Sequence, residues 1–284
     1  MAAPPPSFDR YGDAVPTSPV ILSVPHAGRE YPLALRAALR VPMAAVTILE
    51  DRHIDAVAHA AHGGETMLVQ RRARAWIDLN RSELERDPAI DEGAVWTALP
   101  LTSAKVRGGL GLVPRRVAGA GELWRRRLDA YDVAARIRED HRPYHAALAT
   151  ALTAAQARFG TAVLLDLHSM PTLGPNKPRV VIGDRFGRSA SGRFVAAIEA
   201  AMAAEGYAVA LNTPYAGGHI LDTHARPAAG VQAVQIEFDR SLYLDPAGDR
   251  PGDGLARTAL LLRRIIDTLA DEAIATATIS IAAE

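Results

Sequence analysis

Residues 163–171, VLLDLHSMP, decide the fold of this chain of 284 residues. The stretch opens with apolar residues and a single acidic interruption, which is typical of a short buried strand. His168 follows this apolar run directly, and Pro171 closes it. Open α/β sheets form their ligand sites in the crevice at the carboxyl ends of their strands. His168 is therefore a candidate site residue.

A second stretch has the same design. Residues 20–26 read VILSVPH, again an apolar run that ends in a histidine, His26. One strand-terminal histidine is more often a hydrogen-bonded structural residue than a metal ligand. Two of them, far apart in the sequence, favour a metal site assembled by a sheet.

The composition, with 49% hydrophobic and 23% charged residues, is typical of a soluble globular protein. The formal net charge is zero, so no global field favours nucleic acid. No apolar run approaches the roughly 20 residues of a membrane span. The first residues, MAAPPPSFDR, lack the basic and apolar regions of a secretory signal. We therefore expect a cytoplasmic protein that binds neither nucleic acid nor membrane.

Strand-like runs alternate with helical patterns along the chain, which predicts an α/β fold around one mixed or mostly parallel sheet flanked by helices. Residues 1–19 form an irregular lead-in, and residues 20–284 form one domain. Besides the two runs above, strands are expected at 65–69, 75–79, 179–182, 208–211 and 231–238. Helices are expected at 33–39, 51–61, 122–159 with a break at Pro143, 194–205 and about 255–269, with loops over 80–121.

A metal held by His26 and His168 needs a further ligand, because catalytic zinc commonly has three protein ligands and an open position. The chain has no cysteine, so that ligand must be a carboxylate. Glu30 and Asp51 are the candidates. Asp51 stands at the expected start of the helix over 51–61, where a plain N-cap is an equal interpretation.

Glu237 lies in VQIEF, a strand-like run whose other members are mostly apolar. A buried carboxylate is costly unless it is paired or functional. Glu237 is therefore either a general base that activates a water molecule or one partner of a structural salt bridge.

The segment RAWIDLNR, residues 74–81, delivers Asn80 and Arg81 together at the end of an expected strand. Arginine is suited to bidentate recognition of a carboxylate, and asparagine adds a neutral donor. Arg74 could point toward the same crevice and polarise a scissile carbonyl. Taken singly, each arginine is more often a surface ion-pairing residue.

These segments, in this order, resemble the N-formylglutamate amidohydrolase family, zinc hydrolases related in fold to the zinc carboxypeptidases and aspartoacylases. The matching segments are VPHAG (24–28), DRHID (51–55), RAWIDLNR (74–81), DLHSMP (166–171), NTPYAGGHI (212–220) and HARPAAGVQAVQIEFDR (224–240).

The resemblance implies one zinc ion held by His26, His168 and Asp51, because an acidic residue recurs at the place of Asp51 in the family pattern. It also implies that Glu237 is the general base.

The resemblance further implies that Asn80 and Arg81 bind the carboxylate of the substrate and that Arg74 stabilises the oxyanion. The loop at Gly217 and Gly218 would close over the acyl group, since glycine lets the backbone approach a ligand closely.

The expected activity is metal-dependent removal of an N-formyl or other small N-acyl group from an acidic amino acid, a small anionic substrate. For N-formyl-L-glutamate the products are formate and L-glutamate, which corresponds to a step of histidine degradation. Two alternatives remain: a carboxypeptidase or amidase for larger acyl or peptide substrates, and a non-catalytic binder of anionic metabolites.

Overall fold

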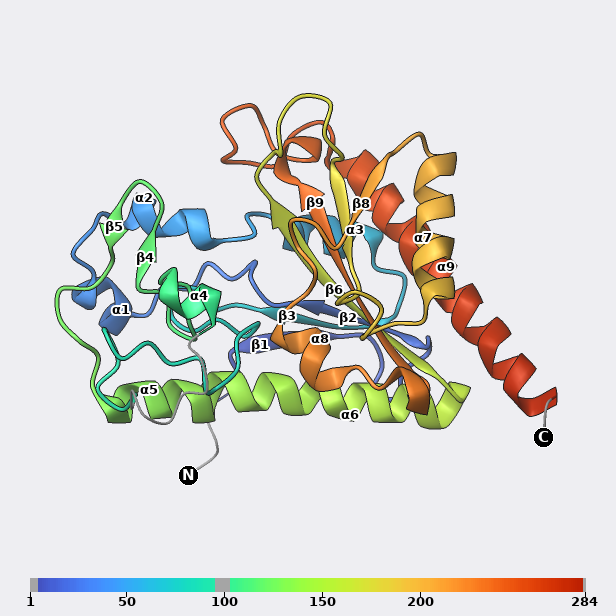
Figure 1. Cartoon of the computed structure of the whole chain (residues 1–284), viewed down its shortest axis with the longest axis horizontal. Helices are drawn as coiled ribbons and strands as arrows, with labels where there is room; N and C mark the ends of the chain where they lie inside the picture. Colours follow the sequence, from blue (N-terminus) through green and yellow to red (C-terminus); the bar gives the residue numbers. More distant parts are fainter. Residues whose placement is uncertain (1–4, 95–102, 283–284) are drawn as a thin grey trace. The chain divides into compact units, whose positions relative to one another are not determined.

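The computed structural model describes residues 5–94 and 103–282, with side chains up to residue 277 (Figure 1). Within one α/β domain, the chain divides into two compact units that alternate along the sequence. Unit 1 comprises Met1–Asp9, Pro25–Asp51 and Gln70–Ala146. Unit 2 comprises Arg10–Val24, Arg52–Val69 and Ala147–Glu284.

A seven-stranded sheet, with nearly all of its residues in unit 2, has the order β1-β3-β2-β6-β9-β7-β8. The pairs β2–β3, β2–β6, β6–β9 and β7–β8 are parallel, and only β7–β9 is described as antiparallel. This confirms the expected mostly parallel mixed sheet. The strands are β1 (Phe8–Tyr11), β2 (Val20–Val24), β3 (Thr66–Gln70), β6 (Ala162–Met170), β7 (Val180–Gly183), β8 (Val209–Leu211) and β9 (Val231–Asp239).

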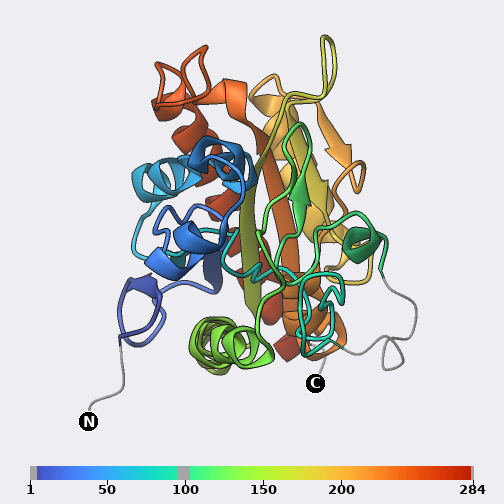
Figure 2. The ribbon, with the colours of Figure 1, turned by 90° about the vertical axis from the view of Figure 1, so that its left-hand side faces the viewer.

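The central strands β2, β6 and β9 are buried along their whole length. Helices cover such strands on their faces, and this is why their sequences are nearly continuous apolar runs. Figures 1 and 2 both show β6 and β9 side by side through the middle of the sheet. The polar residues in these strands are therefore held in the interior, where they need partners.

The helices of unit 2 pack on the sheet and on one another. Helices α3 and α9 contact β2 and β6, and α7 packs against α9. Helix α8 contacts β6 and β9 and lies in front of the strands in Figure 1. Among the described residues, no helix is long and apolar enough to cross a membrane. The bounds are α3 (Ile54–Ala61), α7 (Gly192–Ala204), α8 (His219–His224) and α9 (Leu255–Ala282), with 3₁₀ turns at Pro227–Ala229 and Arg240–Leu242.

Unit 1 has short elements joined by long irregular segments. A π-helical turn, Ile137–His141, joins α5 (Ala130–Arg136) directly to α6 (Arg142–Phe159), whose last thirteen residues belong to unit 2. The other elements are α1 (Leu33–Ala38), α2 (Met43–Val46), a 3₁₀ turn at Thr47–Leu49, α4 (Ala104–Arg107), β4 (Arg116–Val117) and β5 (Gly121–Glu122).

Three expected elements differ in the structure. Residues 75–79 form turns rather than a strand, since the Trp76 amide donates to the Ala73 carbonyl. Pro143 does not break its helix. Proline has no amide to donate, and the π-helical turn that precedes it accommodates the missing donor. Strand β1 lies within the lead-in, and four residues with one clear core position, Phe8, leave little periodicity in the sequence.

Two site residues also sit differently along their elements. His168 lies within β6, which continues to Met170, rather than just past the strand end. Asp51 is not a helix N-cap, because α3 begins only after His53, which has the left-handed φ of 57°. The Asp51 amide instead donates to the His26 carbonyl at 2.9 Å, which draws this residue away from the helix. Part of the expected loop, residues 95–102, is outside the described residues.

Candidate active site

His26 and Asp51 form a buried pair in unit 1. His26 comes two residues after β2, and its Nδ1 lies 3.4 Å from Oδ2 of Asp51. Both residues are at most 3% exposed. On the other side of the ring, Nε2 of His26 lies 2.7 Å from Oδ1 of Asp78. The imidazole is therefore clamped between two carboxylates.

Asp78 is fully buried and collects positive charge. Its Oδ2 accepts from Nε of Arg74 at 2.8 Å, and Nη2 of Arg81 lies 3.9 Å away. Its Oδ1 also accepts from the backbone amide of Asn80 at 2.9 Å. Burial raises the pKa of the Asp78 carboxyl, but the charges of Arg74, Arg81 and His26 outweigh it and hold that pKa well below its usual range. Asp78 is therefore a carboxylate.

In unit 2, His168 is likewise paired through Nε2 with a buried aspartate. Its Nε2 lies 2.8 Å from Oδ2 of Asp166, two residues earlier on β6. The other oxygen of Asp166 accepts from the Ser23 hydroxyl of β2 at 2.8 Å. His168 and Asp166 are both buried. Alternate residues of a strand face the same side, which is why a histidine and an aspartate two apart can meet.

The two carboxylates fix the histidine tautomers. A carboxylate only accepts hydrogen bonds, so the Nε2 atoms of His26 and His168 carry the proton that is donated to it. In a neutral ring the lone pair then lies on Nδ1. A carboxylate that orients a histidine in this way is typical of metal-ligating imidazoles.

The strand that precedes His26 in the sequence, β2, is the parallel neighbour of β6, which carries His168. Strand β2 pairs with β6 so that Ser23 is the partner of Asp166, and His26 follows Ser23 by three residues. His168 thus lies in the carboxyl-terminal part of β6, and His26 follows the carboxyl end of β2. Among the described residues, His26, Asp51 and His168 make up one candidate group for a metal ion.

The chemistry of this donor set fits zinc. Two imidazoles and one carboxylate match the three protein ligands of a catalytic zinc site. Glu30, the other candidate ligand, is exposed, and its carboxylate accepts from Nε of Arg71 at 3.1 Å. The structure thus favours Asp51 over Glu30.

Glu237 lies beside His168 in the sheet. The two residues are register partners on the parallel pair β6–β9, so their side chains leave the same face. The carboxylate of Glu237 is buried and accepts from the side-chain amide of Gln235 at 3.0 Å. Its position allows the general-base role, which stays a prediction.

Arg74, Asn80 and Arg81 lie in one irregular segment of unit 1. Arg81 is buried, and it donates from Nε to the Leu110 carbonyl at 2.8 Å and from Nη1 to the Asn80 carbonyl at 2.6 Å. Arg74 is more open, with 19% of its side chain exposed. Their roles toward a substrate stay predictions.

Gly217 and Gly218 lie directly before α8 in unit 2 and are half-buried. Gly217 has a φ of 101°, and a Cβ there would come within 2.5 Å of the Leu221 side chain. Only glycine fits this turn. The backbone conformation alone explains why residue 217 is a glycine. Contact of the loop with an acyl group therefore stays a prediction.

Asp78 and Asp166 were not predicted as site residues. Both were visible as lone acids in apolar runs, WIDL and VLLDL. The spacing of Asp166 and His168 would have paired them on one strand face. The spacing gives no comparable signal for Asp78, because 52 positions separate it from His26.

Comparisons with known proteins show which family this sequence resembles. The N-formylglutamate amidohydrolase family model matches residues 18–244. The N-formylglutamate deformylase of Pseudomonas aeruginosa is 30% identical over 263 residues, which cover 88% of this chain and 92% of that protein. The enzyme of the same name from Pseudomonas putida is 31% identical, and the match covers 80% of this chain and 82% of that protein.

A solved structure gives the same result. The crystal structure of an N-formylglutamate amidohydrolase from Ralstonia eutropha JMP134 has a TM-score of 0.84 and 30% identity. The match covers 94% of this chain and 98% of that one. The chain belongs to the N-formylglutamate amidohydrolase family.

Proposed function

We propose that this chain hydrolyses N-formyl-L-glutamate to formate and L-glutamate with one zinc ion held by His26, Asp51 and His168. The observation that carries the metal proposal is the pairing of each histidine, through Nε2, with its own buried aspartate. The names of the two Pseudomonas relatives support the substrate.

The metal and the general base have separate tasks. A zinc ion held by His26, Asp51 and His168 would supply Lewis-acid polarisation of the amide carbonyl. Glu237 takes a proton from the attacking water at its carboxylate, while the water oxygen bonds to the formyl carbon. The carbon–nitrogen bond then breaks, and Glu237 returns the proton to the leaving amine nitrogen.

The cationic side chains of unit 1 recognise the anionic parts of the substrate. Arg81 and Asn80 bind a substrate carboxylate, with the guanidinium supplying charge-assisted donors. Arg74 faces the developing oxyanion, because it is the more exposed of the two arginines beside Asp78. Asp78 limits the motion of both arginines and so prepares the site before the substrate enters.

Zinc is the proposed metal because two imidazoles and one carboxylate match a catalytic zinc site and because the family resemblance implies it. The resemblance also implies a role in histidine degradation. We also propose that the protein acts in the cytoplasm.

The test is release of the free amino acid from each substrate by the purified chain, with formate as the second product of N-formyl-L-glutamate, measured before chelation, after chelation and after return of zinc. N-formyl-L-glutamate is compared with N-acetyl and N-succinyl derivatives of glutamate, aspartate and histidine. We expect the fastest turnover with N-formyl-L-glutamate, loss on chelation and recovery with zinc. No formate release by the zinc-restored protein would overturn the proposal, and faster cleavage of larger acyl groups would favour the alternative amidase.

A further inference from the structure

The segment over residues 72–81 carries Arg74, Asp78, Asn80 and Arg81 but has no helix or strand. Its described backbone turns are held by the bonds from the Trp76 amide to Ala73 and from the Arg81 amide to Asp78. Much of the segment is buried, and buried backbone carbonyls need hydrogen-bond donors. The amides of Ala73 and Asp78 donate to the carbonyls of Glu30 and Leu112, and side chains from elsewhere in unit 1 supply donors to carbonyls of the segment.

The helix α5, the π-helical turn and the start of α6 supply these side chains. Arg136 donates from Nη1 to the Trp76 carbonyl at 2.9 Å, and its guanidinium carbon lies 3.7 Å from the Trp76 ring centroid. Asp140 accepts from Nη1 of Arg72 and from Nε1 of Trp76, each at 2.7 Å. These contacts hold the first half of the segment.

Two histidines hold the second half. Nε2 of His141 lies 2.8 Å from the Arg81 carbonyl oxygen, and Nε2 of His145 lies 2.9 Å from that of Leu79. A carbonyl only accepts, so both Nε2 atoms carry the proton and donate it. With the bond from Arg81 Nη1 to the Asn80 carbonyl, three consecutive carbonyls accept from side chains.

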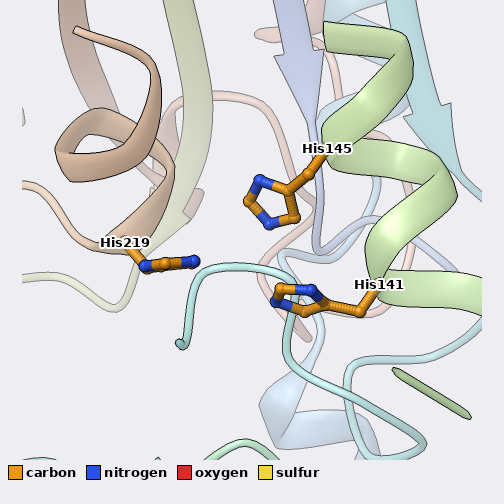
Figure 3. A group of neighbouring side chains, drawn as sticks. All are labelled: His141, His145 and His219. Carbon is orange, nitrogen blue, oxygen red and sulfur yellow. The ribbon is translucent and has the colours of Figure 1, made fainter. Parts of the chain in front are cut away.

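Figure 3 shows His141 and His145 projecting from neighbouring turns of the same helical segment toward the same side; it also labels His219 of α8. The two ring centroids are 4.4 Å apart.

The π-helical turn explains how Arg136 and His141, which are five apart, reach the same segment. Residues five apart on an α-helix point away from each other. The bond from the Arg142 amide to the Ile137 carbonyl spans five residues, as in a π-helix, and such bonding stacks residues five apart. The turn thus lets Arg136 and His141 reach the same segment.

We propose that His141 and His145 are positioning residues for substrate recognition. By holding the carbonyls of Leu79 and Arg81, they fix the Asn80–Arg81 pair in the geometry that a substrate carboxylate requires. Recognition through charge-assisted hydrogen bonds depends on such fixed geometry, and loose supporting contacts weaken it. The inference rests on the proposed function, because it assumes that this pair binds the substrate.

The test compares His141→Leu and His145→Leu, which remove the donor, with His141→Gln and His145→Gln, which keep an N–H donor of similar reach. His59→Leu, an exposed histidine on α3, is the matched control. Kinetic constants are measured for N-formyl-L-glutamate and for neutral N-formyl-L-glutamine amide, together with metal content and thermal unfolding.

We expect each leucine variant to raise KM for N-formyl-L-glutamate about tenfold, the effect of one lost charge-assisted hydrogen bond. Their kcat values and metal content should stay close to those of the wild type, and the neutral amide should be affected much less. The glutamine variants should recover most of the lost affinity. His59→Leu should match the wild type.

Three results would overturn the inference: normal KM in both leucine variants, an equal loss on the neutral amide, or a loss of metal that makes the histidines ligands. The glutamine variants keep the test decisive if the leucine variants do not fold. Failure of the proposed function is distinguishable, because the wild type itself would then release no formate.

Discussion

His168 of β6 and Glu237 of β9 are register partners in the parallel pair at the middle of the sheet. Both are buried, at 3% and 7% exposure, and both leave the same face of the sheet. The fold thus sets a carboxylate directly beside a candidate metal ligand. This relationship makes Glu237 the residue that best separates catalysis from binding.

Glu237→Gln should keep the fold and the metal but lose turnover. Glutamine keeps the shape of the side chain, but it cannot accept a proton from water. Because general acid–base assistance is worth about 10²–10⁴-fold, kcat should fall by that order while KM changes little. Paired measurements of zinc content and turnover check this. Near-normal turnover would make Glu237 structural, and loss of zinc with activity would make it a ligand.

Asp78→Asn and Asp166→Asn should each weaken metal binding about 10- to 100-fold, which is typical of partners that orient ligands. An asparagine amide can donate to Nε2, which favours the tautomer with its proton on Nδ1. Asp184→Asn is the matched control, since Asp184 is also buried but pairs with Asn212. Metal affinity measured by competition with a chelator should separate these variants. Unchanged affinity in both test variants would contradict the tautomer argument.

Asp51→Ala and Glu30→Ala distinguish the two candidate carboxylate ligands. Asp51 is buried beside Nδ1 of His26, whereas Glu30 is exposed and pairs with Arg71. We expect Asp51→Ala to lose zinc on purification and Glu30→Ala to retain it. Metal analysis of the two proteins is sufficient, and the reverse pattern would assign the ligand to Glu30.

The sequence predicted the parts of the site that lie on regular strands. The long apolar runs of β6 and β9 located His168 and Glu237, because buried parallel strands have few polar residues and each one is conspicuous. The run of β2 located His26, which follows that strand by two residues. The alternation of strand-like and helical patterns predicted the α/β class, because this order is typical of a mostly parallel sheet flanked by helices.

The segment around Arg74 and Asp78 could not be predicted in this way. WIDL reads as a strand, yet its residues form turns held by Arg136, Asp140, His141 and His145, more than 50 positions later in the chain. Local propensity cannot anticipate hydrogen bonds from a distant helix, and such tertiary contacts override it. The π-helical turn Ile137–His141 likewise has no clear signal in the sequence other than Pro143.

Arg81→Ala should weaken acidic substrates while leaving zinc in place. The lost charge-assisted anchor is worth about 1.5–3 kcal/mol, or roughly 10- to 100-fold in KM. The variant also loses the donors to the Leu110 and Asn80 carbonyls, so its thermal unfolding is measured alongside. Equal impairment of neutral N-acyl substrates would remove the recognition role from Arg81.

His224 should make the stability of the protein depend on pH. Burial, together with the charge of His219, lowers the pKa of His224 to about 4, below its ordinary 6.5. Between these values the unfolded chain binds the proton more readily than the folded one, so the free energy of unfolding falls as pH falls from 6.5 to about 4. The full effect of His224 is about 3 kcal/mol, fully present above pH 6.5 and lost below about pH 4. Urea unfolding of the wild type is compared with that of His224→Leu at several pH values, so that the contribution of His224 is isolated. We expect the variant to have the shallower pH slope, and equal slopes would show that His224 is not held neutral in the folded state.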